Sequence, residues 1–180
     1  MFALTPRLTL RPGWPEDAPA LSRAIAHEAV VKNLARAPWP YALGDAEAFL
    51  SLPRGAHEPR FQIVTRHDNR LIGGIGLLRE EHGGHEIGYW LTPSDWGRGY
   101  ATEAGRAVID MARHALALPR LAARHYCDNP ASGRVLRKLG FVETGRSRTF
   151  SLARGGEVDS VEMALDLADA DARPEPAMAA

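Results

Sequence analysis

The sequence predicts an α+β domain built on a mixed, mostly antiparallel sheet. Two observations support this fold class: strand-like segments come early, and a strand–helix–strand–helix pattern followed by two further strands completes the chain. With 180 residues, the chain is long enough to bury a sizeable core without disulfides. We therefore expect one domain, over residues 1–167.

Strand and helix patterns alternate in the first half of the chain. The expected elements are a strand at 7–12, a helix beginning at 15–17, shorter helices within 30–52, and strands at 61–65, 71–78 and 86–91. Pro15 and the two acids after it favour a helix start. Residues 67–69 have the composition of a hairpin turn. The glycines at 73, 74 and 76 indicate a bulge or close packing of another backbone.

The second half begins with a helical pattern from Tyr100 that Pro119 limits. The elements expected after it are a strand at 121–127, a helix from 130, and strands at 141–151 and 157–167. Asn129 can cap the second helix, and Gly140 can end it. Residues 168–180 carry almost no large apolar side chain, so they are predicted to be a disordered tail.

Composition narrows the class of protein. Lys plus Arg and Asp plus Glu both number 22, so no basic surplus indicates a nucleic acid or an anionic membrane as partner. No apolar run approaches the ~20 residues of a membrane span. With one cysteine and no apolar leader, a cytoplasmic location is the default expectation. No ligand set for a metal is apparent, and no metal is expected.

The most informative segment is a glycine-containing turn that leads from a strand end into a helix. Amides at such a turn have no intrahelical acceptor, and the helix dipole adds positive potential, so the segment is typical of an anion site. Glycines let a ligand approach the backbone, and Arg98 could add a charged contact. A tight strand-to-helix turn without a ligand remains an alternative. The candidate residues are Gly97, Arg98, Gly99, Tyr100, Ala101 and Thr102.

Further motifs follow this turn, at residues 128–132 and 135–142. Together with it, they resemble the GNAT superfamily of acetyl-CoA-dependent N-acetyltransferases, and most closely its RimJ/RimL branch. The turn matches the family's phosphate loop except for Trp96 in the first position. The likeness extends over residues 5–167. It implies a seven-stranded sheet with helices on both faces, splayed in the middle to hold the cofactor.

The resemblance also implies roles for individual residues. The cofactor phosphates would sit on the turn from Gly97 to Thr102, and its pantetheine arm would pair with backbone around Leu91 and Thr92. Asn129 matches the family position that touches pantetheine, although capping its helix would also explain it. The acetyl group would pass directly to an amine in a ternary complex, without a covalent enzyme intermediate.

The expected proton-transfer groups depart from the common family pattern. Many members use a tyrosine to protonate the departing thiolate, but the corresponding residue here is Leu136. Ser132 is the expected replacement, although a serine in the first helical turn often serves only the helix. Glu86 is the expected base, acting through water, and His85 beside it is an alternative base. Glu86 could equally be a solvated carboxylate at a strand end without a catalytic role.

The acceptor is expected to be a primary amine. Trp39 and Tyr41 lie where family members build the acceptor pocket, although they could equally be core residues. An α-amine with a pKa of ~7.7–8.0 is far more often neutral near neutral pH than a lysine at ~10.4, which favours a protein N terminus. A small-molecule amine (antibiotic, polyamine or amino acid) and a non-catalytic acyl-CoA-binding module stay open, as does a monomer or a homodimer.

Overall fold

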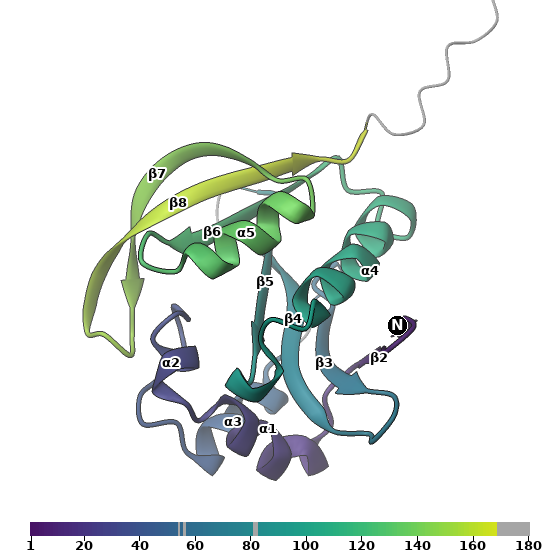
Figure 1. Cartoon of the computed structure of the whole chain (residues 1–180), viewed down its shortest axis with the longest axis vertical. Coiled ribbons are helices and arrows are strands. Elements are labelled where there is room, and N and C mark those ends of the chain that lie inside the picture. The colour runs from purple at the N-terminus through teal and green to yellow at the C-terminus, as the bar shows by residue number, and fades with distance from the viewer. Residues whose placement is uncertain (54, 56, 81–82, 169–180) are drawn as a thin grey trace, which may run out of the picture.

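The computed structural model describes residues 1–53, 55, 57–80 and 83–168, and a single twisted sheet runs through them (Figure 1). The strand order is β1-β2-β3-β4-β5-β6-β8-β7, and every neighbouring pair is antiparallel except β5 and β6, which are parallel. The strands are β1 (Ala3–Leu4), β2 (Leu8–Arg11), β3 (Arg60–Thr65), β4 (Leu71–Arg79), β5 (His85–Leu91), β6 (Arg120–Tyr126), β7 (Val142–Ser151) and β8 (Gly156–Asp166). The predicted mixed, mostly antiparallel sheet is confirmed.

The sheet has eight strands in the described residues, one more than the resemblance implied. The additional strand is β1, which pairs with β2 through Ala3 opposite Leu10 and Leu4 opposite Thr9. Two residues are too few to show an alternating pattern, so this strand could not be predicted from the sequence.

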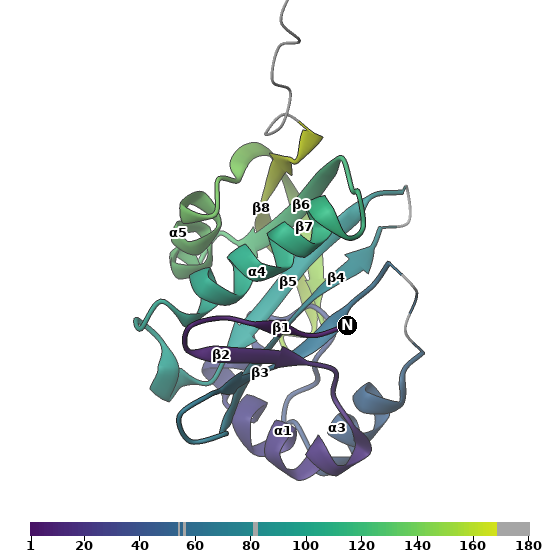
Figure 2. The same ribbon diagram turned by 90° about the vertical axis from the view of Figure 1, so that its right-hand side faces the viewer.

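Helices cover both faces of the sheet (Figures 1 and 2). They are α1 (Ala18–Ile25), α2 (Glu28–Val31), α3 (Leu43–Ser51), α4 (Tyr100–His114) and α5 (Pro130–Lys138). The predicted helix start at Pro15 is a 3-10 turn, Pro15–Asp17, that continues directly into α1. The short helices expected within 30–52 begin slightly earlier than predicted, because α2 starts at Glu28.

The main core lies between the sheet and the pair α4 and α5. Ala104, Val108 and Ala112 of α4 are fully buried, and they share one cluster with strand residues such as Ile72 and Ile87. Their spacing is the helical period expected for a stripe packed on a sheet. This packing fixes the start of α4 at the carboxyl end of β5.

Glycines of β4 leave room for Trp90 of the neighbouring strand β5. A Cβ atom at Gly73 would lie 2.2 Å from the Trp90 carbonyl oxygen, and one at Gly74 would lie 2.7 Å from the Trp90 indole nitrogen. The expected close approach of another backbone is therefore confirmed. Trp90 packs against two smaller clusters that contain buried residues of α1, α2 and α3.

The C-terminal strands β7 and β8 form a long hairpin next to β6. Of the predicted disordered tail, residues 169–180 lie outside the described residues. Within the part of the chain that the structure describes, no helix is long and apolar enough to cross a membrane.

Candidate active site

The two parallel strands in the middle of the sheet separate soon after they meet. Pairing between β5 and β6 is limited to Glu86 with Ala122 and Ile87 with Ala123, and Figure 1 shows the strands diverging beyond this point. We call the opening between the later parts of these strands the split. It leaves one edge of β5 without a neighbouring strand from Gly88 onward.

Tyr89 and Leu91 present their backbone groups to the split. The Thr92 amide donates to the Ile72 carbonyl oxygen of β4 at 2.8 Å. Because the hydrogen-bonding groups of successive residues alternate between the two edges of a strand, those of residues 89 and 91 face away from β4. The Leu91 carbonyl also accepts a hydrogen bond from the Trp96 indole at 2.8 Å. Of the two residues expected to pair with pantetheine, Leu91 therefore faces the split, whereas the Thr92 amide is already engaged.

The predicted anion site lies at the carboxyl end of β5. A 3-10 turn, Pro93–Asp95, leads into Gly97 and Gly99, which have φ angles of +74° and +80°. Such positive φ values are readily adopted only by glycine. No described residue accepts a hydrogen bond from the backbone amides at the start of α4 and in the turn before it: Gly97, Arg98, Gly99, Tyr100, Ala101 and Thr102. We call these six residues the cradle.

Asp95, at the end of the 3-10 turn, holds the segment before the cradle in place. Its fully buried carboxylate accepts two hydrogen bonds from Arg70, at 2.7 and 2.9 Å, and one from the Ser94 hydroxyl at 2.9 Å. The Arg70 guanidinium, the Ser94 bond and Arg98 hold the pKa of the Asp95 carboxyl below its usual range, against the opposing effect of burial. The exposed Arg98 side chain lies 3.9 Å from Asp95. The sequence had not indicated this anchor.

Arg7 joins the cradle to the N-terminal strands. Its guanidinium donates to the Arg98 carbonyl oxygen at 3.0 Å and to the Glu103 carboxylate at 2.7 Å, and it stacks 4.5 Å from the centre of the Tyr100 ring. Glu103 also accepts hydrogen bonds from the Thr5 hydroxyl and the Arg7 amide. These contacts tie the cradle to residues more than 90 positions away, and Glu103 balances the charge of Arg7.

The first turn of α5 lies beside the split, next to Tyr89 of β5. The Asn129 side chain accepts a hydrogen bond from the Ser132 amide at 3.3 Å, which confirms the predicted cap. The Tyr89 hydroxyl lies 2.9 Å from the Ser132 hydroxyl and 3.1 Å from the Ser132 carbonyl oxygen. Burial raises the pKa of Tyr89 to about 12, although the bond with Ser132 opposes this. Leu136, at the family's usual tyrosine position, is buried in the main core.

Glu86 lies where β5 and β6 still pair. Burial raises the pKa of its carboxyl group, while Arg124, whose guanidinium is 3.2 Å away, partly offsets that rise. His85 instead approaches His57, and burial together with the nearby charges of His57 and Arg79 lowers its pKa. A carboxyl group with a raised pKa is a stronger base than an ordinary one, so Glu86 remains the better candidate.

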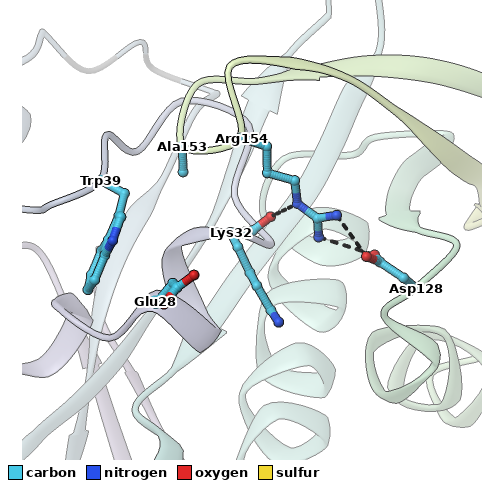
Figure 3. A pocket seen from close by; sticks show the side chains of 6 residues that line it. All are labelled: Glu28, Lys32, Trp39, Asp128, Ala153 and Arg154. Carbon is cyan, nitrogen blue, oxygen red and sulfur yellow. Dashed lines mark hydrogen bonds and ion pairs between the residues drawn. The ribbon is translucent and has the colours of Figure 1, made fainter.

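A cavity of about 290 Å³ lies between α2, the β6–α5 turn and the β7–β8 turn (Figure 3). Its lining residues are Glu28, Lys32, Trp39, Asp128, Ala153 and Arg154. Arg154 donates to both Asp128 carboxylate oxygens, at 2.7 and 3.1 Å, and to the Lys32 carbonyl oxygen at 2.7 Å. Trp39 lines this cavity, and its expected role in acceptor binding stays a prediction. Tyr41 does not line it and instead packs half-buried against Trp90 in the smaller clusters.

Together these parts could hold an extended ligand. A molecule with amide groups could pair with the open edge of β5 and place a diphosphate in the cradle, while its other end lies near Ser132. No group of three or more His, Cys, Asp or Glu side chains suited to a metal ion occurs among the described residues. The cofactor and catalytic roles of individual residues stay predictions.

Comparison with known proteins places this architecture among acetyltransferases. Residues 7–142 match the family model described as the acetyltransferase (GNAT) domain. YoaA of Bacillus subtilis, named an uncharacterized N-acetyltransferase, is 31% identical over 161 residues, which are 87% of this chain and 91% of YoaA. The ribosomal-protein-serine acetyltransferase of Escherichia coli is 35% identical over 80 residues, 43% of this chain and 45% of that protein.

A solved structure shares the fold over nearly the whole chain. It is titled RimL, a ribosomal L7/L12 alpha-N-protein acetyltransferase in complex with coenzyme A. The TM-score is 0.79 at 20% identity, and the match covers 93% of this chain and 99% of the other. At that identity the likeness concerns the fold alone.

Proposed function

The chain belongs to the GNAT family of N-acetyltransferases, and on that premise we propose that it transfers the acetyl group of acetyl-CoA to the α-amine of a protein N terminus. The observation that carries this proposal is the split between β5 and β6 with the cradle at one end. One end of the split offers unpartnered amides, and the other offers the Ser132 hydroxyl.

The residues present fit acetyl-CoA. The cradle amides would bind the diphosphate, since they combine free donors with the positive end of α4. A Cβ atom at Gly97 would meet nothing within 4 Å, so a ligand can approach the backbone there. The Tyr89 backbone groups and the Leu91 amide would pair with the amides of the pantetheine arm, and Asn129 would contact the arm near Ser132.

Acetyl-CoA would supply an activated acetyl thioester. In the transfer an N–C bond replaces the C–S bond, the amine loses one proton and the sulfur gains one. Ser132 is the proposed proton donor to the sulfur. Glu86 is the proposed acceptor of the amine proton. Because Glu86 is not among the residues that line the cavity, a water molecule would carry the proton from the amine to its carboxylate.

The preference for an α-amine follows from its pKa. Roughly a quarter of α-amines are neutral near pH ~7.4, compared with about 0.1% of lysine side chains. Arg124 offsets part of the rise in the Glu86 pKa, so Glu86 gains only part of the basicity that burial would give it, which suits the more acidic amine. The names of RimL and the E. coli relative are consistent with this acceptor class.

A small-molecule amine is the second candidate, and the cavity favours it. Its volume of about 290 Å³ suits a small acceptor, and its lining carries two acidic and two basic side chains, Glu28, Asp128, Lys32 and Arg154. Such a lining would accept a molecule with both an ammonium group and an anionic group more readily than a polyamine.

Variants of the proposed proton-transfer groups test whether the protein is a catalyst. Ser132→Ala and Glu86→Gln should each lower kcat at least tenfold while acetyl-CoA still binds, as measured by calorimetry. A wild-type protein that binds acetyl-CoA but transfers acetyl to no peptide or small amine would support the non-catalytic acyl-CoA-binding alternative. Full activity of both variants would contradict the assigned roles.

A further inference from the structure

The hydroxyl pair formed by Tyr89 and Ser132 has a role that the family resemblance did not assign. We propose that Tyr89 is a positioning residue that directs the Ser132 hydroxyl proton toward the sulfur of the bound cofactor. This inference rests on the proposed function, because it needs a thioester in the split and Ser132 as the group beside its sulfur.

The hydrogen bond between the two side chains crosses the split. Tyr89 lies on β5 two residues beyond Ile87, the last residue that pairs with β6. Ser132 lies on α5, which follows β6 along the chain. The 2.9 Å contact between their hydroxyl oxygens therefore joins the two sides of the opening where β5 has lost its neighbour. A ligand that follows the β5 edge inward from the cradle would meet this pair.

The proton count explains why Tyr89 matters. Each hydroxyl carries one proton, and Tyr89 can donate it either to the Ser132 hydroxyl or to the Ser132 carbonyl oxygen 3.1 Å away. If Tyr89 donates to the carbonyl, the Ser132 proton can point back to Tyr89. If Tyr89 donates to the Ser132 hydroxyl, the Ser132 proton is free to point into the split. Negative charge on a sulfur beside Ser132 favours the second arrangement.

The surroundings of Tyr89 keep its proton in place. The ring packs against the main core, and the raised pKa keeps the phenol protonated near neutral pH. Tyr89 therefore remains a donor as charge develops on the sulfur. It acts through Ser132 and need not touch the cofactor sulfur.

The test uses coenzyme A itself as the probe, with Tyr89→Phe, Ser132→Ala and the double variant. Tyr126→Phe is the matched control, because the Tyr126 hydroxyl is buried without a hydrogen-bond partner among the described residues. The pKa of the bound thiol is read from thiolate absorbance as the difference between coenzyme A-loaded and free protein at each pH. Steady-state kinetics with acetyl-CoA and a peptide amine give kcat and KM, and thermal unfolding reports stability.

We expect Tyr89→Phe to raise the bound thiol pKa by about one unit and to lower kcat about tenfold, the size of one lost hydrogen bond to a charged group. The KM for acetyl-CoA should stay within about twofold, and Tyr126→Phe should match the wild type. In the Ser132→Ala background, removing the Tyr89 hydroxyl should change neither kcat nor the thiol pKa further.

Two results would overturn the inference. One is a wild-type thiol pKa and kcat in Tyr89→Phe. The other is that Tyr89→Phe lowers kcat equally whether or not the Ser132 hydroxyl is present. Tyr89 would then act by holding α5 through the Ser132 carbonyl. If no amine is acetylated but the thiol pKa responds as expected, the proposed function fails while the positioning role of Tyr89 stands.

Discussion

Replacing Gly97 by alanine should weaken acetyl-CoA binding by more than it weakens the fold. Gly97 has a φ angle of +74°, and placing a Cβ atom in this left-handed region costs about 1–2 kcal/mol. No atom lies within 4 Å of that Cβ position, so no clash adds to this cost. The melting temperature should fall by about 2–8 °C. The methyl group would also occupy the space above the cradle, where a phosphate must approach the amides.

Loss of one hydrogen bond to a charged phosphate, about 1.5–3 kcal/mol, corresponds to a decrease in affinity of at least about tenfold. Calorimetric titration with acetyl-CoA measures this change. Gly155→Ala is the matched control, because Gly155 has a φ of +65° and equally open surroundings but lies in the β7–β8 turn. The control should lose similar stability and keep its affinity. Wild-type affinity in Gly97→Ala would refute the placement of the diphosphate.

Three further substitutions test other parts of the site. Asp95→Asn should lower the free energy of unfolding at pH 7 by about 2 kcal/mol, because the charge-assisted bonds with Arg70 are lost. Urea unfolding should show this difference shrinking at low pH, as acid protonates the wild-type carboxyl below its usual pKa of 3.8, and a difference that stays constant with pH would contradict this reason. The kcat/KM of the wild type should rise with pH through the raised pKa of Glu86, and pH–rate profiles of Glu86→Gln should lack this limb; an unchanged profile would exclude Glu86 as the base. Arg154→Met should raise the acceptor KM several-fold at unchanged acetyl-CoA affinity, because Arg154 joins Asp128 to α2 beside the cavity. An unchanged acceptor KM in steady-state kinetics would argue against acceptor binding in this cavity.

The sequence predicted the elements that carry a strong local pattern. The turn at Gly97 and Gly99 has the positive φ angles for which glycine is suited, and the cap at Asn129 forms as expected. Both features depend on a few consecutive residues, so they can be recognised locally. Strand β1 was missed because its two residues are defined only by pairing with β2.

Contacts between distant segments could not be predicted in the same way. Asp95 is an ordinary turn residue in the sequence, and its burial against Arg70 depends on how the β3–β4 turn meets the segment before the cradle. Tyr89 alternates with its neighbours like any strand residue, and only the divergence of β5 from β6 brings its hydroxyl to Ser132. Tyr41 could not be assigned from the sequence either, because an aromatic residue near prolines fits a pocket or a core equally well. In the structure it packs in a hydrophobic cluster and does not line the cavity.

The most direct test of the central claim is acetyl transfer from acetyl-CoA to a panel of amines, followed by mass spectrometry and corrected for background hydrolysis. The panel contains peptides with free N termini, lysine peptides blocked at the N terminus, polyamines, amino acids and amine antibiotics. We predict acetylation of free N termini, with little product on blocked lysine peptides. Product only on lysine side chains or small amines would contradict the proposed acceptor, and no product on any amine despite tight binding of acetyl-CoA would contradict the proposed catalysis.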